Sequence, residues 1–112
     1  MFNPKPEIYA KLCEIEDVQV SQSSQNIFNT TPAITYRIDG NAADYCLEND
    51  IASQQILCSI DIWTDDSKTA SILLVQVEAK MRELNYRLNN ALDVPAPEGA
   101  LHHINAAFVG LR

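Results

Sequence analysis

The side chains best suited to metal binding or nucleophilic chemistry are two neighbouring histidines and three cysteines, and their spacing favours neither. His102 and His103 fall in a segment with the alternation of a strand, where neighbours point to opposite faces, so the pair does not chelate one metal ion. Cys13, Cys46 and Cys58 form no C-x-x-C pair and no zinc-binding spacing. We therefore predict no metal and no cofactor, and free thiols typical of the cytoplasm.

The carboxylates that stand together are better explained as helix caps than as acid–base catalysts. Asp65 and Asp66 directly precede a helical pattern, where a carboxylate accepts hydrogen bonds from free backbone N–H groups. The three glycines are too sparse for a phosphate-binding loop, and no serine lies in a nucleophile motif. We predict that the protein is not an enzyme. Asp61 and Trp63 remain as candidates for a contact surface.

Length and charge bound the class of protein. The 112 residues, 46% of them hydrophobic, predict one domain over residues 1–112. Because 15 Asp and Glu outnumber 8 Lys and Arg, specific nucleic-acid binding is not expected. No apolar run approaches the ~20 residues of a membrane helix, and no secretory signal is expected. The charge is uneven: residues 1–66 carry −8 and residues 67–112 carry +1.

The N-terminal part predicts a helix, a short strand and a polar loop. Apolar residues at helical spacing predict the helix over residues 5–15. Alternation predicts the strand at residues 18–20. Residues 21–31 are polar and predict a loop, in which Ile27 and Phe28 either pack back onto the core or meet a partner.

The middle of the chain predicts a hairpin with a long acidic loop. Residues 32–38 alternate as a strand, which Asp39 and Gly40 end. The clear alternation over residues 54–63 predicts a second strand with one covered and one polar face. Residues 41–50 are predicted to be the loop between them. Its acidic residues are Asp44, Glu48 and Asp50.

A long helix and a last strand complete the predicted fold. An apolar stripe predicts the helix over residues 67–90, with Arg82 and Arg87 in its C-terminal half. Residues 101–109 alternate as a strand. We expect an α+β fold of order α-β-β-β-α-β, with a four-stranded, mainly antiparallel sheet and two helices packed on one face.

Three motifs follow one another at positions that suggest a family. They are residues 31–36 (TPAITY), residues 60–64 (IDIWT) and residues 79–86 (AKMRELNY). Over nearly the whole chain, their order and spacing resemble the small tail-completion, or tail-terminator, proteins of long-tailed bacteriophages and prophages. The Asn85-Tyr86 pair departs from the glycine–aromatic ending expected there, so the helix is expected to end later in this chain.

The resemblance implies a structural role in the virion. Such proteins form a ring, commonly a hexamer, at the head-proximal end of the tail tube. The ring stops tube growth and offers a surface to the head connector protein, and DNA passes through it without specific binding. The resemblance also implies assembly in the bacterial cytoplasm, no membrane partner and no catalytic residues.

The uneven charge suggests how copies of the chain could meet. A ring needs a heterologous contact, and the acidic half and the half with Arg82 and Arg87 are a candidate pair. A free strand edge, possibly that of the last strand, could add β-pairing between subunits. If Asp44, Glu48 and Asp50 faced the lumen, they would repel DNA.

One alternative function stays open. The chain could be a small monomeric binding module that uses its open sheet face for a peptide or small ligand. The residues expected on that face are Leu57, Ser59, Asp61 and Trp63.

Overall fold

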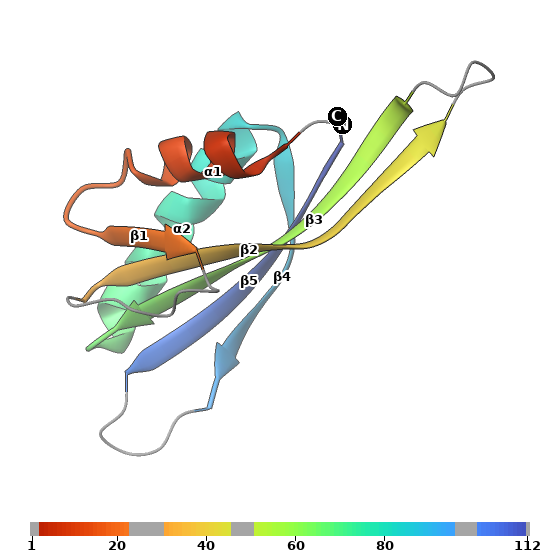
Figure 1. Cartoon of the computed structure of the whole chain (residues 1–112). Coiled ribbons are helices and arrows are strands. Elements are labelled where there is room, and N and C mark those ends of the chain that lie inside the picture. The colour runs from red at the N-terminus through yellow and green to blue at the C-terminus, as the bar shows by residue number, and fades with distance from the viewer. Residues whose placement is uncertain (1–2, 23–30, 46–50, 96–100, 112) are drawn as a thin grey trace.

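The computed structural model describes residues 3–22, 31–45, 51–95 and 101–111, which form two helices and five strands (Figure 1). In chain order these are α1 (Lys5–Leu12), β1 (Gln19–Gln22), β2 (Ala33–Tyr45), β3 (Ile51–Thr64), α2 (Ser67–Glu83), β4 (Tyr86–Val94) and β5 (His102–Leu111). The predicted α+β class is confirmed. Both helices cover the same face of the sheet and share one apolar core with it.

The sheet has one strand more than predicted, and it is mixed. Its strand order is β1-β2-β3-β5-β4. β1 pairs with β2 in parallel, and the other three pairs are antiparallel. The element order is α-β-β-β-α-β-β, so the predicted order was wrong at its C-terminal end. The last strand is not a free edge, because β5 lies between β3 and β4.

The long helix ends seven residues earlier than predicted. α2 stops at Glu83, and the residues that follow form the edge strand β4. Asn85 takes a left-handed backbone conformation with φ 66°, which reverses the chain after the helix. Leu88 continues the helical spacing, but it packs against the core from β4. The prediction failed because Leu88 would face the core in a continued helix just as it does in β4, so its apolar character does not distinguish the two.

Residues 41–45 of the acidic segment belong to a strand, where a loop was predicted over residues 41–50, and residues 46–50 lie outside the described part of the chain. β2 continues to Tyr45 and pairs with β3 up to Ile51, with a bulge between Ile38 and Gly40. β1 accompanies β2 only as far as Tyr36, and β5 reaches only Gln55 on β3.

Strand residues 42–45 and 51–54 therefore extend beyond the rest of the sheet (Figure 1). The segment 42–54 is here called the outer hairpin. The molecule is elongated as a result, with extents of 55 × 26 × 24 Å. That length exceeds the width of about 34 Å expected for a globule of this size.

The core follows the two strongest sequence patterns. The predicted apolar faces of β3 and α2 are buried; these residues are Ile56, Cys58, Ile60, Ile62, Ala70, Leu73, Val77 and Met81. Asp66 caps α2 as expected, since its carboxylate accepts from the N–H of Lys68 at 2.7 Å and of Thr69 at 3.3 Å. The Thr69 hydroxyl and these two N–H groups hold the pKa of Asp66 below its usual value. The helix predicted over residues 5–15 would place Cys13 on its apolar face, but α1 ends at Leu12 and the thiol is exposed.

Tyr86 joins the first helix to the last strand. Its ring is fully buried against Gly110 of β5, where an added Cβ would lie 2.5 Å from two ring carbons. Its hydroxyl donates to Oε1 of Glu7 in α1 at 3.0 Å. Only glycine at position 110 leaves room for this ring, so two distant parts of the chain depend on one contact.

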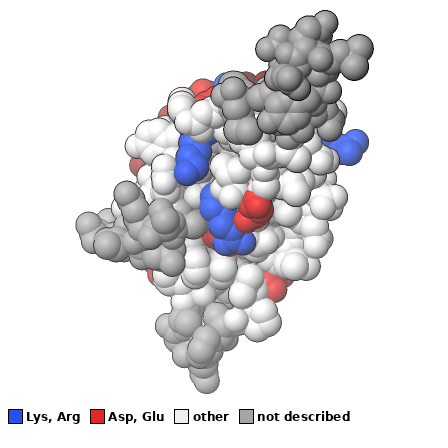
Figure 2. Space-filling view, turned by 45° about the vertical axis from the view of Figure 1, so that its right-hand side comes forward, with Lys and Arg blue, Asp and Glu red and all other residues white. Residues whose placement is uncertain are grey.

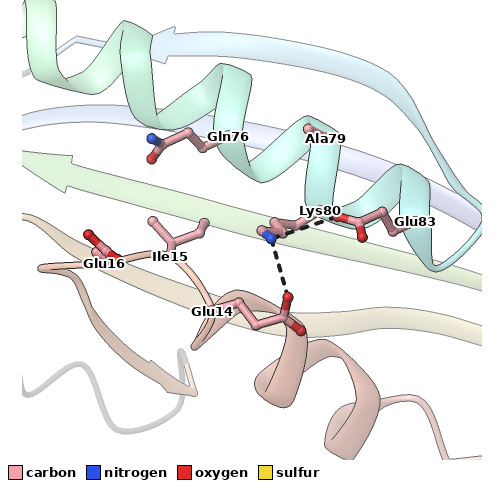
Figure 3. A pocket seen from close by; sticks show the side chains of 7 residues that line it. All are labelled: Glu14, Ile15, Glu16, Gln76, Ala79, Lys80 and Glu83. Carbon is pink, nitrogen blue, oxygen red and sulfur yellow. Dashed lines mark hydrogen bonds and ion pairs between the residues drawn. The ribbon is translucent and has the colours of Figure 1, made fainter.

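A cluster of ion pairs joins α1 to α2. The Nζ of Lys80 lies 3.2 Å from Oε1 of Glu14 and 3.8 Å from Oε2 of Glu83, and Lys11 contacts the same two carboxylates. Hydrogen bonds from Lys80 and Lys11 hold the pKa of Glu14 below its usual value. A shallow pocket beside the cluster is lined by Glu14, Ile15, Glu16, Gln76, Ala79, Lys80 and Glu83 (Figure 3). Its charges already pair with one another, so we interpret the cluster as a structural contact that holds α1 against α2.

Candidate interaction surface

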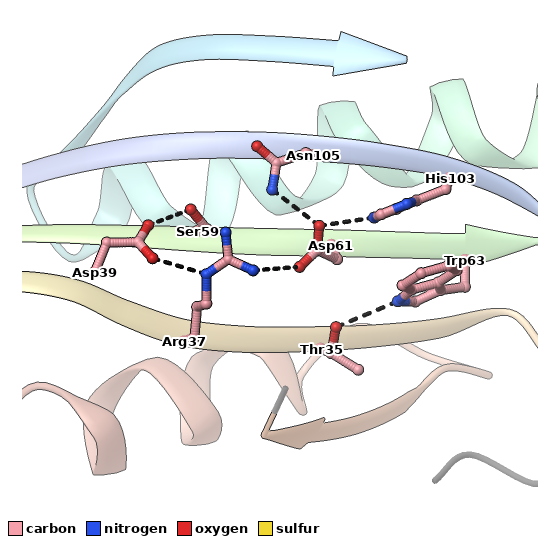
Figure 4. A network of polar contacts seen from close by, with 8 residues as sticks. All are labelled: Thr35, Arg37, Asp39, Ser59, Asp61, Trp63, His103 and Asn105. Atoms are coloured by element: carbon pink, nitrogen blue, oxygen red, sulfur yellow. Dashed lines mark hydrogen bonds and ion pairs between the residues drawn. The ribbon is translucent and has the colours of Figure 1, made fainter. Parts of the chain in front are cut away.

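The sheet face opposite the helices, here called the open face, carries most of the candidate residues. Strand register places the side chains in rows across the sheet: Arg37, Ser59 and Ala107 form one row, and Asp61 and Asn105 lie in the next. Eight polar and aromatic side chains from β2, β3 and β5 meet there (Figure 4). No helix covers this network.

Asp61 is the centre of the network. The residue is only 4% exposed, although it lies on the open face. Its Oδ1 accepts from Nδ2 of Asn105 at 2.9 Å and lies 2.7 Å from Nε2 of His103. Its Oδ2 lies 3.7 Å from a guanidinium nitrogen of Arg37. Burying a carboxylate is unfavourable without such partners, so these three side chains stabilise Asp61 in place.

Trp63 packs within its own chain. Its indole stacks on the His103 ring with centroids 3.7 Å apart and an angle of 14° between the planes. Its Nε1 donates to Oγ1 of Thr35 at 3.2 Å. We predicted that Trp63 marks a contact surface; the structure shows that it covers the end of the network beside Asp61 (Figure 4).

The bulge in β2 supplies the other end of the network. Asp39 has no partner in the register and turns its carboxylate to the Ser59 hydroxyl and to Nε of Arg37, the latter at 2.7 Å. Partial burial favours the neutral form of Asp39, but these donors outweigh it and hold its pKa below the usual value. The opposite charges of Arg37 and Asp39 leave this part of the open face close to neutral.

Apolar side chains lie exposed around the network. They are Leu57 of β3, Leu92 and Val94 of β4, and Leu111 of β5. Figure 2, in which the right-hand side of Figure 1 comes forward, shows mostly uncharged residues with a small group of charged ones near the centre. A nearly neutral face with exposed apolar residues suits contact with another molecule.

The structure brings together only some of the predicted site residues. Asp61 and Trp63 belong to the network just described. Arg82 pairs with Glu78 one turn earlier in α2, so its charge is balanced by a carboxylate of the same helix. Arg87 lies in β4, where a helix was predicted, and is exposed.

For five predicted site residues the structure does not describe the side chain, so their predicted roles stay predictions. The backbone of Asp44 belongs to β2, but its side chain lies outside the described part of the chain. Four further residues lie outside the described residues altogether: Ile27, Phe28, Glu48 and Asp50.

Sequence reasoning missed the partners of Asp61. The alternation of residues 101–109 did place His103 and Asn105 on one face of a strand, but it held no sign of which strand lies alongside. The register that sets these side chains against Asp61 is a property of the folded sheet.

Among the described residues, no group of three His, Cys, Asp or Glu side chains is placed to hold a metal ion. No helix in the described ranges has the length and apolar character required to cross a membrane. No protein-family model matches the chain, and no curated protein matches it.

Proposed function

We propose that this chain is a structural subunit that caps the tail tube of a bacteriophage or prophage as a ring and forms the surface to which the head connector binds. The observation that carries the proposal is the outer hairpin. A two-stranded ribbon is only marginally stable alone in water, and here its strands run past every neighbouring strand of the subunit. Such a projection favours contact with another molecule.

The end of α2 adds support to the family resemblance. The motif in this family is expected to end in glycine and an aromatic residue, and this chain has Asn85 and Tyr86. Asn85 adopts φ 66°, a conformation that glycine takes most easily and asparagine takes better than most residues. The departure from the motif therefore preserves the local geometry that a glycine would provide.

The dimensions of the subunit fit a ring that passes DNA. Six equal bodies in a closed ring surround a hole about as wide as one of them, and the two short axes of this subunit measure 26 and 24 Å. The chain has a net charge of −7, which disfavours binding of phosphate. DNA would then pass through the ring without being held.

Association state and tube binding test this function. Purified protein is examined by light scattering and native mass spectrometry, alone and with isolated tail tubes. We expect one ring per tube end, and a ring of defined stoichiometry at high protein concentration. A protein that stays monomeric at every concentration and leaves tube ends bare would overturn the proposal.

The exposed apolar residues of the open face favour one other function, a monomeric module that binds a peptide or small ligand. The same experiment separates the two functions, since the binding module stays monomeric and ignores tail tubes. In that case substitution of Leu57 or Leu92 by a polar residue should weaken ligand binding and leave the association state unchanged.

A further inference from the structure

A shallow hollow lies on the open face beside the base of the outer hairpin. It is lined by Gln55, Asn85, Arg87, Val109, Gly110 and Leu111, and is here called the Arg87 slot. Leu111 is 68% exposed. Leu57, also exposed, lies beside Val109 in the register. The slot thus offers apolar surface with a single charge, that of Arg87.

Arg87 differs from the other described arginines in having no ion pair within the described part of the chain. Arg37 pairs with Asp39, and Arg82 pairs with Glu78. No acidic residue lines the slot. A guanidinium beside apolar side chains suits a segment that is both acidic and apolar, because the carboxylates pair with the arginine while the apolar side chains lose contact with water.

The outer hairpin has that composition. Residues 42–54 contain no Lys or Arg and three acidic residues, which are Asp44, Glu48 and Asp50. They alternate with apolar residues of the same stretch, which are Tyr45, Leu47 and Ile51. The acidic residues of the hairpin complement the positive charge of the slot, and its apolar residues complement the apolar lining.

The hairpin of a subunit does not reach the slot of that same subunit. Gln55 lines the slot and pairs with Leu111, whereas Ile51 pairs with Tyr45 near the far end of the hairpin. These β3 residues are four positions apart, about 13 Å along a strand. The hairpin also points away from the sheet (Figure 1). A hairpin that occupies the slot must therefore come from another copy of the chain.

We propose that the outer hairpin of one subunit docks in the Arg87 slot of the next. The contact is heterologous, since hairpin and slot are different surfaces, and repeating it forms a ring when the rotation between neighbours closes. The inference rests on the proposed function and names its subunit contact. It assigns the acidic residues of the hairpin to this contact in place of the lumen.

Complementation between two defective variants tests the contact. Arg87→Glu reverses the slot charge, and replacement of residues 44–53 by Asn-Gly removes the hairpin while keeping the pairing of Ala43 with Gln54. Each variant alone should be monomeric. Mixed in equal amounts, they should form a 1:1 dimer that grows no further, because only one working hairpin and one working slot remain. Arg82→Glu is the matched control and should still form rings.

Cross-linking tests the same contact at residue level. In a Cys13→Ser background, Leu111→Cys should form disulfide-linked chains with the native Cys46 of neighbouring copies under mild oxidation. A disulfide needs its two Cα atoms within about 7 Å. Within one subunit, Leu111 pairs with Gln55, whereas Tyr45, the residue before Cys46, pairs with Ile51, four positions further along β3. The control is Val75→Cys on α2, since Val75 is 69% exposed and lies on the helix side. It should give no cross-linked ladder.

The outcomes separate this inference from the function on which it rests. If the wild type forms rings but the mixed variants give no dimer, or Leu111→Cys links no better than Val75→Cys, the slot contact is wrong and the ring proposal stands. If the wild type forms no ring, even on tail tubes, both are wrong. Dimers in the mixture together with a Leu111-specific ladder support both.

Discussion

At the scale of single residues, Asp61 links the open face of the sheet into one unit. Its two oxygens meet side chains from β2 and β5, the strands on either side of β3. Every one of these partners is polar or charged, and all lie close to a carboxylate that is almost out of contact with water. Removing the carboxylate therefore affects several side chains together.

We expect Asp61→Ala to destabilise the fold by about 1–3 kcal/mol, because it leaves the amide of Asn105 and the imidazole of His103 without their acceptor. Urea denaturation followed by circular dichroism measures the change. Asp61→Asn keeps an acceptor of the same shape and should lose less. Equal stability of Asp61→Ala and the wild type would show that the network is only a surface feature.

Cys58 gives a second prediction at this scale. Burial in the core, with a smaller effect of Asp39, raises the pKa of its thiol from 9.0 to about 12. Since the unfolded thiol ionises at lower pH than the folded one, the contribution of this group to stability is complete below pH 9. It is lost as the pH rises toward 12.

Thiol labelling at pH 8 measures the accessibility of these cysteines. Exposed Cys13 should react at once, whereas Cys58 should react only as fast as the protein unfolds. Cys13→Ser should abolish the fast reaction at that site and leave the slow one. Rapid labelling of Cys58 in the folded protein would contradict its place in the core.

At the scale of elements, the end of α2 depends on one backbone conformation. A residue with a branched side chain is strained at φ 66°, so Asn85→Val should cost about 1–2 kcal/mol, whereas Asn85→Gly should be neutral or slightly stabilising. Thermal unfolding of both variants measures the difference. If Asn85→Val is tolerated as well as Asn85→Gly, the left-handed turn is not required between α2 and β4.

The same turn shows what local patterns predict and what they do not. The faces of β3 and the buried stripe of α2 could be predicted, since both repeat over many residues with one period. β4 could not, because Leu84 and Leu88 keep the spacing of the helix into the strand. The outer hairpin was also missed, since its polar, acidic residues have the composition of a loop. Its strands are set by pairing with each other across the sheet.

At the scale of the whole molecule, the subunit consists of a two-layer body and a projecting hairpin. The body joins helices and sheet through one core, whereas among the described strands residues 42–45 and 51–54 pair only with each other. Backbone hydrogen bonds with no further layer around them open more readily.

Hydrogen exchange followed by mass spectrometry should therefore show two classes of amide exchange rate in the monomer. Amides of the outer hairpin strands should exchange rapidly, and those at the centre of β3 and β5 slowly. After ring assembly the hairpin amides should become protected, while the centre of the sheet stays unchanged. If the hairpin is equally protected in monomer and ring, it is stabilised within the subunit and does not depend on a neighbour.

The contact of Tyr86 with Gly110 and Glu7 has a practical consequence for handling the protein. It holds the start of α1 near the end of β5, and Leu111 at that end lines the Arg87 slot. A purification tag appended after Arg112 would thus begin two residues beyond Leu111, which lines the Arg87 slot. Assembly assays are cleaner with a cleavable tag, or with an affinity sequence inserted in the connection between β4 and β5, at the opposite end of those strands.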